Sequence, residues 1–535
     1  MLRSKLFWAL FFICFAIGAV LGYLFIGHSV PGTARYIPAD ISGVLTLQTK
    51  RLGADILLGG KLNTDTSLAS NKIYQRWKKI SAENGGIGIS FTSDVLIFQT
   101  QSREHQQWYT GMVVKVDDEL KLKIFLQTKF TQLLDTAQVH LSALVASPGY
   151  SSLVLIDDDW RSPVGIGFNH DVMVVLTACY EVRDNSFFNP ELKRIFNMPK
   201  DSSILSNKVF RESEKQSADV SLWINLNAPA IKDLLGTKPG QNSKEGFLQA
   251  FLDFNKGEIN LRVGHLSEDL PGKNVFGKPA SNSSFSNYVD TARFMGMLST
   301  HVDLQTLFER IRSEGHGSRL DLVCNKWGLS PDDISGSFDG NADLALNGFV
   351  HFNEKYIAYE YDDNFNQVEV PHDREARIPG FVLRLGINGP QAMTLLLPKL
   401  LASKTITVCQ NGFRLNSELP VYFHPMGPQL FISSSEEMPI ARERGPIEGI
   451  VLKKFPVTDG SWAYIDLKGT AQCIHTEFSN KPDMHPFAGV FNRILIAIEE
   501  QEPGKTNCNI RVGCTNPSTN SLVSLLNLML DLNHR

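Results

Sequence analysis

The chain has 535 residues, of which 43% are apolar and 20% charged, and its formal net charge at pH 7 is −4. This composition is typical of a globular protein and excludes a disordered or low-complexity chain. The small negative charge provides no strong field for a polyanion, so we expect no nucleic-acid partner.

The first predicted element is an uninterrupted apolar run from Leu6 to Ile26, which follows the basic residues Arg3 and Lys5. Its 21 residues carry no charge. As a helix they would reach about 30 Å, enough to cross a bilayer core. Basic residues before such a run stay in the cytoplasm. We therefore predict a single-pass membrane protein with a cytoplasmic start (1–5), an anchor in the lipid bilayer (6–26) and a spacer (27–35). The bulk of the chain is then periplasmic or extracellular.

Two alternatives to a retained anchor remain open. A cleaved signal peptide has an apolar region of about 7–15 residues, which is shorter than this run. The nearest cleavage-like triplet, Ala16-Ile17-Gly18, lies inside the run. A lipoprotein signal would use Cys14, but it needs a small residue before the cysteine, and Ile13 stands there. Gly18 and Gly22 form a small-xxx-small pair through which two anchors could pack as a dimer, although such pairs are common by chance.

The exported part shows internal similarity. The segment Asn260-Leu261-Arg262-Val263-Gly264 recurs as Asn509-Ile510-Arg511-Val512-Gly513, and the segments before it recur in the same order. In the first half these segments are 36–58, 94–100, 111–125, 163–177 and 219–235; in the second they are 293–311, 333–348, 380–397, 420–434 and 461–473. We therefore predict two tandem repeats, 36–267 and 289–535, joined by a linker at 268–288 that is rich in Pro, Gly, Ser and Asn.

Each repeat is predicted to be α+β. Its strands are rich in Val, Ile, Phe and Tyr, and short turns such as Asn169-His170 and Met426-Gly427 favour antiparallel pairing. Helical segments follow single strands, for example at 120–134 and 391–401. The expected fold is an N-terminal transmembrane helix followed by two tandem similar repeats, each a mostly antiparallel sheet with helices packed on one face.

Six cysteines lie beyond the anchor, namely Cys179, Cys324, Cys409, Cys473, Cys508 and Cys514. An exported chain could pair them. However, Cys508 and Cys514 flank a strand-like segment, which would hold their Cα atoms about 20 Å apart, beyond disulfide reach. The other four show no framework spacing. Buried thiols are therefore favoured over a disulfide scaffold.

Enzymatic signatures are mostly absent. The sequence contains neither an H-E-x-x-H zinc motif nor a G-x-S-x-G nucleophile elbow. Gly504-Lys505-Thr506 resembles the end of a phosphate-binding loop, but Glu499 stands where that loop needs a glycine. We predict no catalytic residues and no cofactor.

Three acidic groups could in principle hold a cation. They are Asp362, Asn364 and Asn366; Asp339, Asn341 and Asp343; and Asp157, Asp158 and Asp159. The first group lacks the glycine that a calcium loop needs next, since Gln367 is there. Turn residues and a solvated strand end explain all three groups. His170-Asp171 at a hairpin tip has no identifiable nucleophile partner. We therefore predict no metal site.

Segment 203–226 (SILSNKVFRESEKQSADVSLWINL) resembles an uncharacterised domain family of Bacteroidetes envelope proteins, many of them lipoproteins. The opening YIPADISGVLTLQTKRL and Asn520-Ser521-Leu522 before an apolar helix are similar to that family as well. The resemblance covers most of 36–530 and implies an extracytoplasmic, membrane-attached protein with no established activity. The chain departs from the family in lacking the lipid-attachment context.

These observations favour a non-enzymatic binding or scaffold protein of the bacterial cell envelope, with an envelope protein as its partner. Two similar repeats would create a groove between them, which is a usual place for a ligand. One alternative is an envelope hydrolase acting on peptidoglycan or glycan, whose mark would be two acidic side chains about 5–10 Å apart in a concave pocket. Another alternative is an envelope assembly factor with a long unprotected edge strand.

Overall fold

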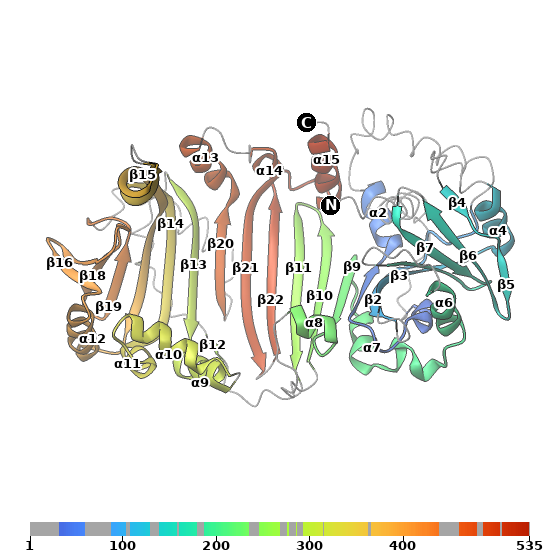
Figure 1. Cartoon of the computed structure of the whole chain (residues 1–535), viewed down its shortest axis with the longest axis horizontal. Coiled ribbons are helices and arrows are strands. Elements are labelled where there is room, and N and C mark those ends of the chain that lie inside the picture. The colour runs from blue at the N-terminus through green and yellow to red at the C-terminus, as the bar shows by residue number, and fades with distance from the viewer. Residues whose placement is uncertain are drawn as a thin grey trace. The chain divides into compact units, whose positions relative to one another are not determined.

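The computed structural model describes residues 31–58, 87–102, 107–128, 139–157, 160–178, 187–234, 246–267, 275–277, 285, 293–313, 315–361, 365–437, 460–478, 485–502 and 505–533. The chain divides into two compact units (Figure 1). Unit 1 comprises Met1–Asp269 together with Asn516–Arg535, and unit 2 comprises Leu270–Thr515.

The C-terminal segment belongs to unit 1. Its helix α15 (Ser521–Asn533) contacts α2 (Thr49–Leu58) near the other end of the chain. Just before α15, the Asn520 side chain donates a hydrogen bond of 2.8 Å to the carbonyl of Phe254. Leu522 then packs into the same core as Leu52 of α2. The last part of the chain therefore returns to the unit in which the chain began.

The sheet of unit 1 is antiparallel throughout its described pairings. Its strands pair in the order β6–β7–β8–β3–β2–β1–β9–β10–β11. Their bounds are β1 (Gly43–Leu47), β2 (Val95–Gln101), β3 (Trp108–Lys115), β6 (Tyr150–Asp157), β7 (Trp160–Phe168), β8 (Val172–Ala178), β9 (Val220–Asn225), β10 (Gly246–Asn255) and β11 (Glu258–Ser267). Short strands β4 (Val139–Leu141) and β5 (Val145–Ser147) pair with β6.

Both faces of this sheet are covered. On β2, Leu96 and Phe98 enter one core, whereas Val95 and Ile97 pack in the other. One face carries α2, α15 and α4 (Glu119–Thr128). The other carries η1 (Gly32–Tyr36), α6 (Phe188–Phe196), η3 (Ile204–Ser206) and α7 (Lys208–Glu214), with η2 (Lys200–Ser202) next to η3. The prediction of helices on one face is wrong, and the run Val172–Leu176, buried at every position, indicates why. Strands covered on both sides are apolar on both sides.

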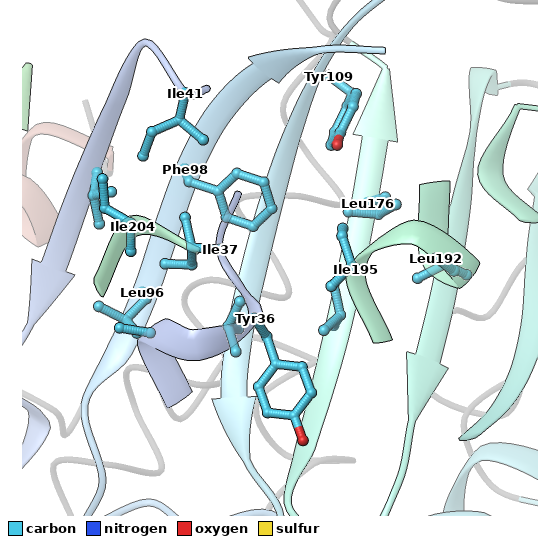
Figure 2. Close-up of a cluster of buried hydrophobic side chains, with 14 of the residues drawn as sticks. Tyr36, Ile37, Ile41, Leu96, Phe98, Tyr109, Leu176, Leu192, Ile195 and Ile204 are labelled. Carbon is cyan, nitrogen blue, oxygen red and sulfur yellow. The ribbon is translucent and has the colours of Figure 1, made fainter. Parts of the chain in front are cut away.

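Figure 2 shows the core beneath α6 and η1, where Tyr36, Ile37, Phe98, Leu192 and Ile195 meet. Glycines on the strands make room for large side chains there. A Cβ atom at Gly111 of β3 would lie 2.2 Å from the Phe98 ring. A Cβ atom at Gly165 of β7 would lie 2.7 Å from the ring of Phe188. Helix α6 can therefore lie directly on β7 because β7 has no side chain at that position.

Unit 2 is also built on antiparallel sheet. Its strands pair in the order β16–β17–β18–β19–β15–β14–β13–β20–β21–β22, with β12 beside β13. Their bounds are β12 (Phe276–Gly277), β13 (Phe294–Val302), β14 (Phe338–Tyr361), β15 (Gln367–Ile387), β16 (Ile406–Cys409), β17 (Gly412–Leu415), β18 (Tyr422–Met426), β19 (Gln429–Ser433), β20 (Ser461–Asp466), β21 (Phe491–Glu502) and β22 (Lys505–Cys514).

Unit 2 has two apolar cores on opposite sides of β19. Leu430 and Ile432 pack with α12, whereas Phe431 packs with Phe285 and Phe294. A capping box starts α11: the Ser330 hydroxyl accepts from the amide of Asp333, and the Asp333 carboxylate accepts from the amide of Ser330. The described helices of unit 2 are α9 (Leu304–Ser313), α10 (Gly317–Lys326), α11 (Pro331–Ser337), α12 (Pro390–Ala402), α13 (Leu467–Glu477) and α14 (His485–Val490). Unit 1 also contains α8 (Pro229–Leu234).

The prediction of a transmembrane helix followed by two tandem similar repeats is wrong for the described residues. They form extended antiparallel sheet, and the C-terminal segment assigned to the second repeat belongs to unit 1. Strands β14 and β15 are 24 and 21 residues long, against 7 and 8 for β2 and β3. The recurring pentapeptide marks a local likeness, since β11 and β22 are each the second strand of a hairpin.

The anchor predicted at 6–26, with Gly18 and Gly22, lies outside the described residues. Among the helices that the structure does describe, none combines the length and apolarity that a membrane crossing requires. Most of the predicted linker, 268–288, is likewise outside the described part of the chain.

Candidate functional site

A hollow of about 950 Å³ opens in unit 1, in the size range of small-molecule sites. One wall comes from β5 and β6, with Val145, Ser147 and Tyr150. The other comes from α6 and the segment that follows it to Ser202. The Tyr150 ring stacks on Phe196 of α6 with centroids 4.6 Å apart and planes 2° from parallel, which joins the two walls.

The sequence of α6 explains how it presents this wall. Leu192 and Ile195 are buried against the sheet, as the spacing of an amphipathic helix requires. Asn189 and Lys193 lie on the exposed side and line the hollow. A Cβ atom at Gly167 of β7 would lie 2.7 Å from the Phe196 ring. The strand thus lets the helix approach closely.

A buried acidic residue, Glu191, is among the residues that line the hollow. Glu191 is 2% exposed, and one of its oxygens accepts hydrogen bonds from the Tyr109 hydroxyl at 2.9 Å and from Nε of Arg194 at 2.8 Å. Its other oxygen accepts from the Ser102 hydroxyl at 2.8 Å. Arg194 also donates to the Tyr109 hydroxyl at 2.9 Å and lies 3.4 Å from the Asp40 carboxylate. A buried charge held by this many partners is positioned rigidly.

The pKa values of Tyr109 and Arg194 are both raised in this network. Burial, together with the Glu191 carboxylate, raises the pKa of Tyr109 far above its usual range. Burial alone would lower the pKa of Arg194, but the Glu191 and Asp40 carboxylates beside it more than reverse this, so it too is raised. Tyr109 therefore stays protonated and Arg194 stays charged at every physiological pH.

Other polar side chains around the hollow are available. Ser147, Asn189, Asn197 and Ser202 line it, and within the described part of the chain their side chains make no hydrogen bond. The Lys193 ammonium has no carboxylate partner among the same residues. Pro190, Met198 and Pro199 add apolar surface between these groups. The hollow therefore offers unengaged hydroxyl and amide groups beside apolar patches.

A second group of carboxylates lies elsewhere in unit 1. Asp219 accepts from the amide of Phe254 at 2.6 Å and pairs with Nε of Arg51 at 2.9 Å, while Asp253 lies 3.4 Å from the Arg51 guanidinium. Burial raises the pKa of Asp55 to about 7, and the neighbouring Asp219 adds to this. When Asp55 is protonated, its carboxyl is the donor of the side-chain hydrogen bond to Asp219 that contributes to this shift. Arg51 compensates the remaining charge, so this group ties α2 to β9 and β10.

The structure separates the acidic residues that the sequence had grouped. Asp339 accepts from the amide of Asn341 at 2.8 Å, the Asn341 side chain contacts His301 at 3.2 Å, and Asp343 pairs with Arg384. These side chains therefore engage different partners instead of one cation. Within the described residues, no group of three or more His, Cys, Asp or Glu side chains could hold a metal ion.

The remaining residues singled out from the sequence do not meet at a site. His170 and Asp171 lie at the turn between β7 and β8, with Asp171 also 3.3 Å from the Tyr36 hydroxyl. Lys505 and Thr506 lie in β22. Asn366 lies just before β15. Asp158, Asp159, Asp362, Asn364, Gly504 and Cys179 are outside the described residues.

The cysteines agree with the expectation only in part. Cys324 and Cys514 are buried, whereas Cys409, Cys473 and Cys508 are half-buried. Cys508 and Cys514 both lie in strand β22, which keeps them too far apart to bridge each other. The Cys473 thiol lies 3.8 Å from the carbonyl of Arg293.

Sequence reasoning missed the Glu191 network. Glu191 and Arg194 stand three residues apart on α6, a spacing that places them on one helix face. That spacing was the available signal. Tyr109 and Ser102 are more than 80 positions earlier, and only the packing of α6 on the sheet brings them to the pair.

A family model described as Domain of unknown function (DUF4836) matches residues 62–360, which is more than half of the chain. No curated protein and no solved structure matches the sequence.

Proposed function

This chain belongs to the family described as Domain of unknown function (DUF4836), and from that premise we propose that it is a non-enzymatic binding or scaffold protein of the bacterial cell envelope. In this proposal residues 6–26 anchor it in the membrane and the rest of the chain is exported. The finer resemblance, to Bacteroidetes envelope proteins that include lipoproteins, is part of the same proposal.

The observation that carries the proposal is the hollow beside α6. Its size suits a ligand, and four of its polar side chains are unengaged in the described part of the chain. Its one described carboxylate, Glu191, is held by Ser102, Tyr109 and Arg194. A carboxylate so engaged favours a structural role over acid–base work, because a general acid or base must exchange its proton with the substrate.

Two other functions are alternatives to this one. A hydrolase acting on peptidoglycan or glycan would use two carboxylates across a pocket, and among the described lining residues Glu191 alone is acidic. An assembly factor would present a long unprotected edge strand. Strands β5 and β16 are only three and four residues long. However, residues 350–361 of β14 and 367–378 of β15 pair, within the described part of the chain, only with each other, so this alternative keeps long strand edges in its support.

Crosslinking in living cells tests the binding function directly. A photo-reactive amino acid is placed in the full-length protein at position 193, at the rim of the hollow, and in a matched protein at position 216. Gln216 is exposed in the same unit and is not part of the hollow. We expect one reproducible, stoichiometric adduct from position 193 and none from position 216. Identical patterns from both positions would contradict a binding role for the hollow.

Membrane attachment is tested on the same cells. The full-length protein should remain in the membrane pellet after alkaline carbonate washing, and its mass should retain the N-terminal residues. A variant that lacks residues 6–26 should lose membrane attachment. If the mature protein lacks these residues in mass spectrometry, the segment is a cleaved signal peptide and the proposed anchor is wrong.

A further inference from the structure

We propose that the hollow beside α6 binds a carbohydrate chain through its hydroxyl and amide side chains. This inference rests on the proposed binding function and names the ligand class for the same site. Three features of the hollow support it. The Glu191 and Arg194 charges are already paired, several polar side chains are free, and apolar surface lies beside them.

The charges of Glu191 and Arg194, which line the hollow, are paired within the protein. Glu191 pairs with Arg194 at 2.8 Å, and Arg194 also faces Asp40 at 3.4 Å. The Arg194 guanidinium is therefore committed to these carboxylates and to Tyr109, and it is not presented as a fork to an anion. The only described lining charge outside this network is Lys193, which is exposed at the rim. A ligand dominated by charge, such as a phosphate, would find one ammonium and no clamp.

The groups that remain can both donate and accept hydrogen bonds. The amides of Asn189 and Asn197 each carry donor and acceptor atoms, and the hydroxyls of Ser147 and Ser202 do the same. Sugar hydroxyls also donate and accept, so they can pair with either end of such groups. Between them, Met198 and Pro199 provide apolar surface against which the C–H face of a sugar ring can pack.

The geometry favours a sugar chain over an extended peptide. Extended peptides are commonly bound by adding a strand to a sheet edge, where backbone groups supply the affinity. Of the two strands that border the hollow, β6 is already paired with β5 and β7, and β5, at the sheet edge, is only three residues long. The wall opposite is a helix, which has no free backbone ladder. Recognition in this hollow therefore depends on side chains, and at about 950 Å³ it has room for more than one sugar ring.

The test is calorimetric titration of the detergent-purified full-length protein. The probes are hexamers of N-acetylglucosamine, mannose and galacturonic acid, together with a soluble Gly-Ser hexapeptide. The variant Asn189→Ala with Asn197→Ala removes two exposed amides, and Gln216→Ala removes an exposed amide away from the hollow. We expect the N-acetylglucosamine or the mannose hexamer to bind, with Kd weakened about tenfold or more by the double variant, and the charged galacturonic acid hexamer to bind more weakly or not at all. The Gln216→Ala protein should bind like the wild type.

Each other outcome overturns the inference. Binding of the hexapeptide and of no sugar would assign the hollow to peptides. Sugar binding that the double variant leaves unchanged would place the carbohydrate site elsewhere. If no probe binds but position 193 still captures a protein in cells, the binding function stands and the carbohydrate inference falls. If position 193 captures nothing as well, both fall.

Discussion

Two buried carboxylate–guanidinium pairs, one in each unit, have different surroundings. In unit 2, Asp343 and Arg384 face each other across β14 and β15, and their side chains are 7% and 5% exposed. In unit 1, Glu191 and Arg194 lie on one helix, and the Arg194 side chain is 21% exposed at the hollow. The first pair is enclosed by the core, whereas the second forms part of a surface that a ligand can reach.

The two pairs differ in how completely neighbouring side chains enclose them. The Arg384 guanidinium lies 5.7 Å from the centre of the Phe285 ring, which covers it, and Ser299 also bonds Asp343. Burial still raises the pKa of Asp343 despite its cationic partner. By contrast, Glu191 accepts hydrogen bonds from Ser102 and Tyr109 beside an open hollow. Removing one member of an enclosed pair destabilises the fold strongly, because the other charge stays buried without a partner. Beside a partly exposed pair, water can replace the lost partner.

The largest effect is therefore expected at Arg384. The substitution Arg384→Met leaves the Asp343 carboxylate buried without its cation, which should lower the free energy of unfolding by about 3–5 kcal/mol. Chemical denaturation measures the loss, and hydrogen exchange should show it in the amides of 341–347. The double variant Asp343→Leu with Arg384→Met removes both charges and should recover most of the stability. A double variant as unstable as the single one would mean that packing, rather than charge, is responsible.

A third buried carboxylate extends the comparison because it has no cationic partner among the residues that the structure describes. Glu214 is 9% exposed and accepts hydrogen bonds of 3.1 Å from the hydroxyls of Thr46 and Ser221. Burial raises its pKa from 4.5 to about 7; the two hydroxyls oppose this, and Asp94 adds to it. Between these values the folded state binds more protons than the unfolded state. The stabilising contribution of protonated Glu214 is therefore full below about pH 4.5 and is lost as the pH rises through 7.

The substitution Glu214→Gln should remove this pH dependence. Glutamine keeps an acceptor for Thr46 and Ser221 but carries no titrating proton. At pH 8 the variant should be more stable than the wild type by on the order of 2 kcal/mol, and near pH 4 the two should be similar. Denaturant titrations at pH 4, 6 and 8 measure this. Asp55, whose pKa is also about 7, leaves some slope in both proteins. Equal slopes in both proteins would show that Glu214 ionises freely in the fold.

Local sequence patterns predicted much of the sheet and little of the site. The alternation and turn signals correctly predicted antiparallel strands such as β7 and β8, because these depend on neighbouring residues. Coverage of both faces was missed although the run Val172–Leu176 carried the signal. The partners of Glu191 could not be predicted, because Tyr109 and Ser102 reach it only through the packing of α6 on β7. The recurring pentapeptide was over-interpreted, since a hairpin strand can recur without a complete repeat.

The smallest effect is expected at the hollow, and neighbouring cations on α6 provide its control. Arg194→Met removes the cation from Glu191, but because Arg194 is 21% exposed, water can enter and take over part of its role. We expect a loss of about 1–2 kcal/mol, less than at Arg384. Lys193→Met removes an equal charge from an exposed position without a described partner and should change stability by less than about 0.5 kcal/mol. Equal effects of the two substitutions in denaturant unfolding would mean that the net charge of α6 matters and the Glu191 network does not. A loss at Arg194 as large as that at Arg384 would mean that the hollow excludes water as the core does, and it would then be too closed to admit a sugar chain without rearrangement.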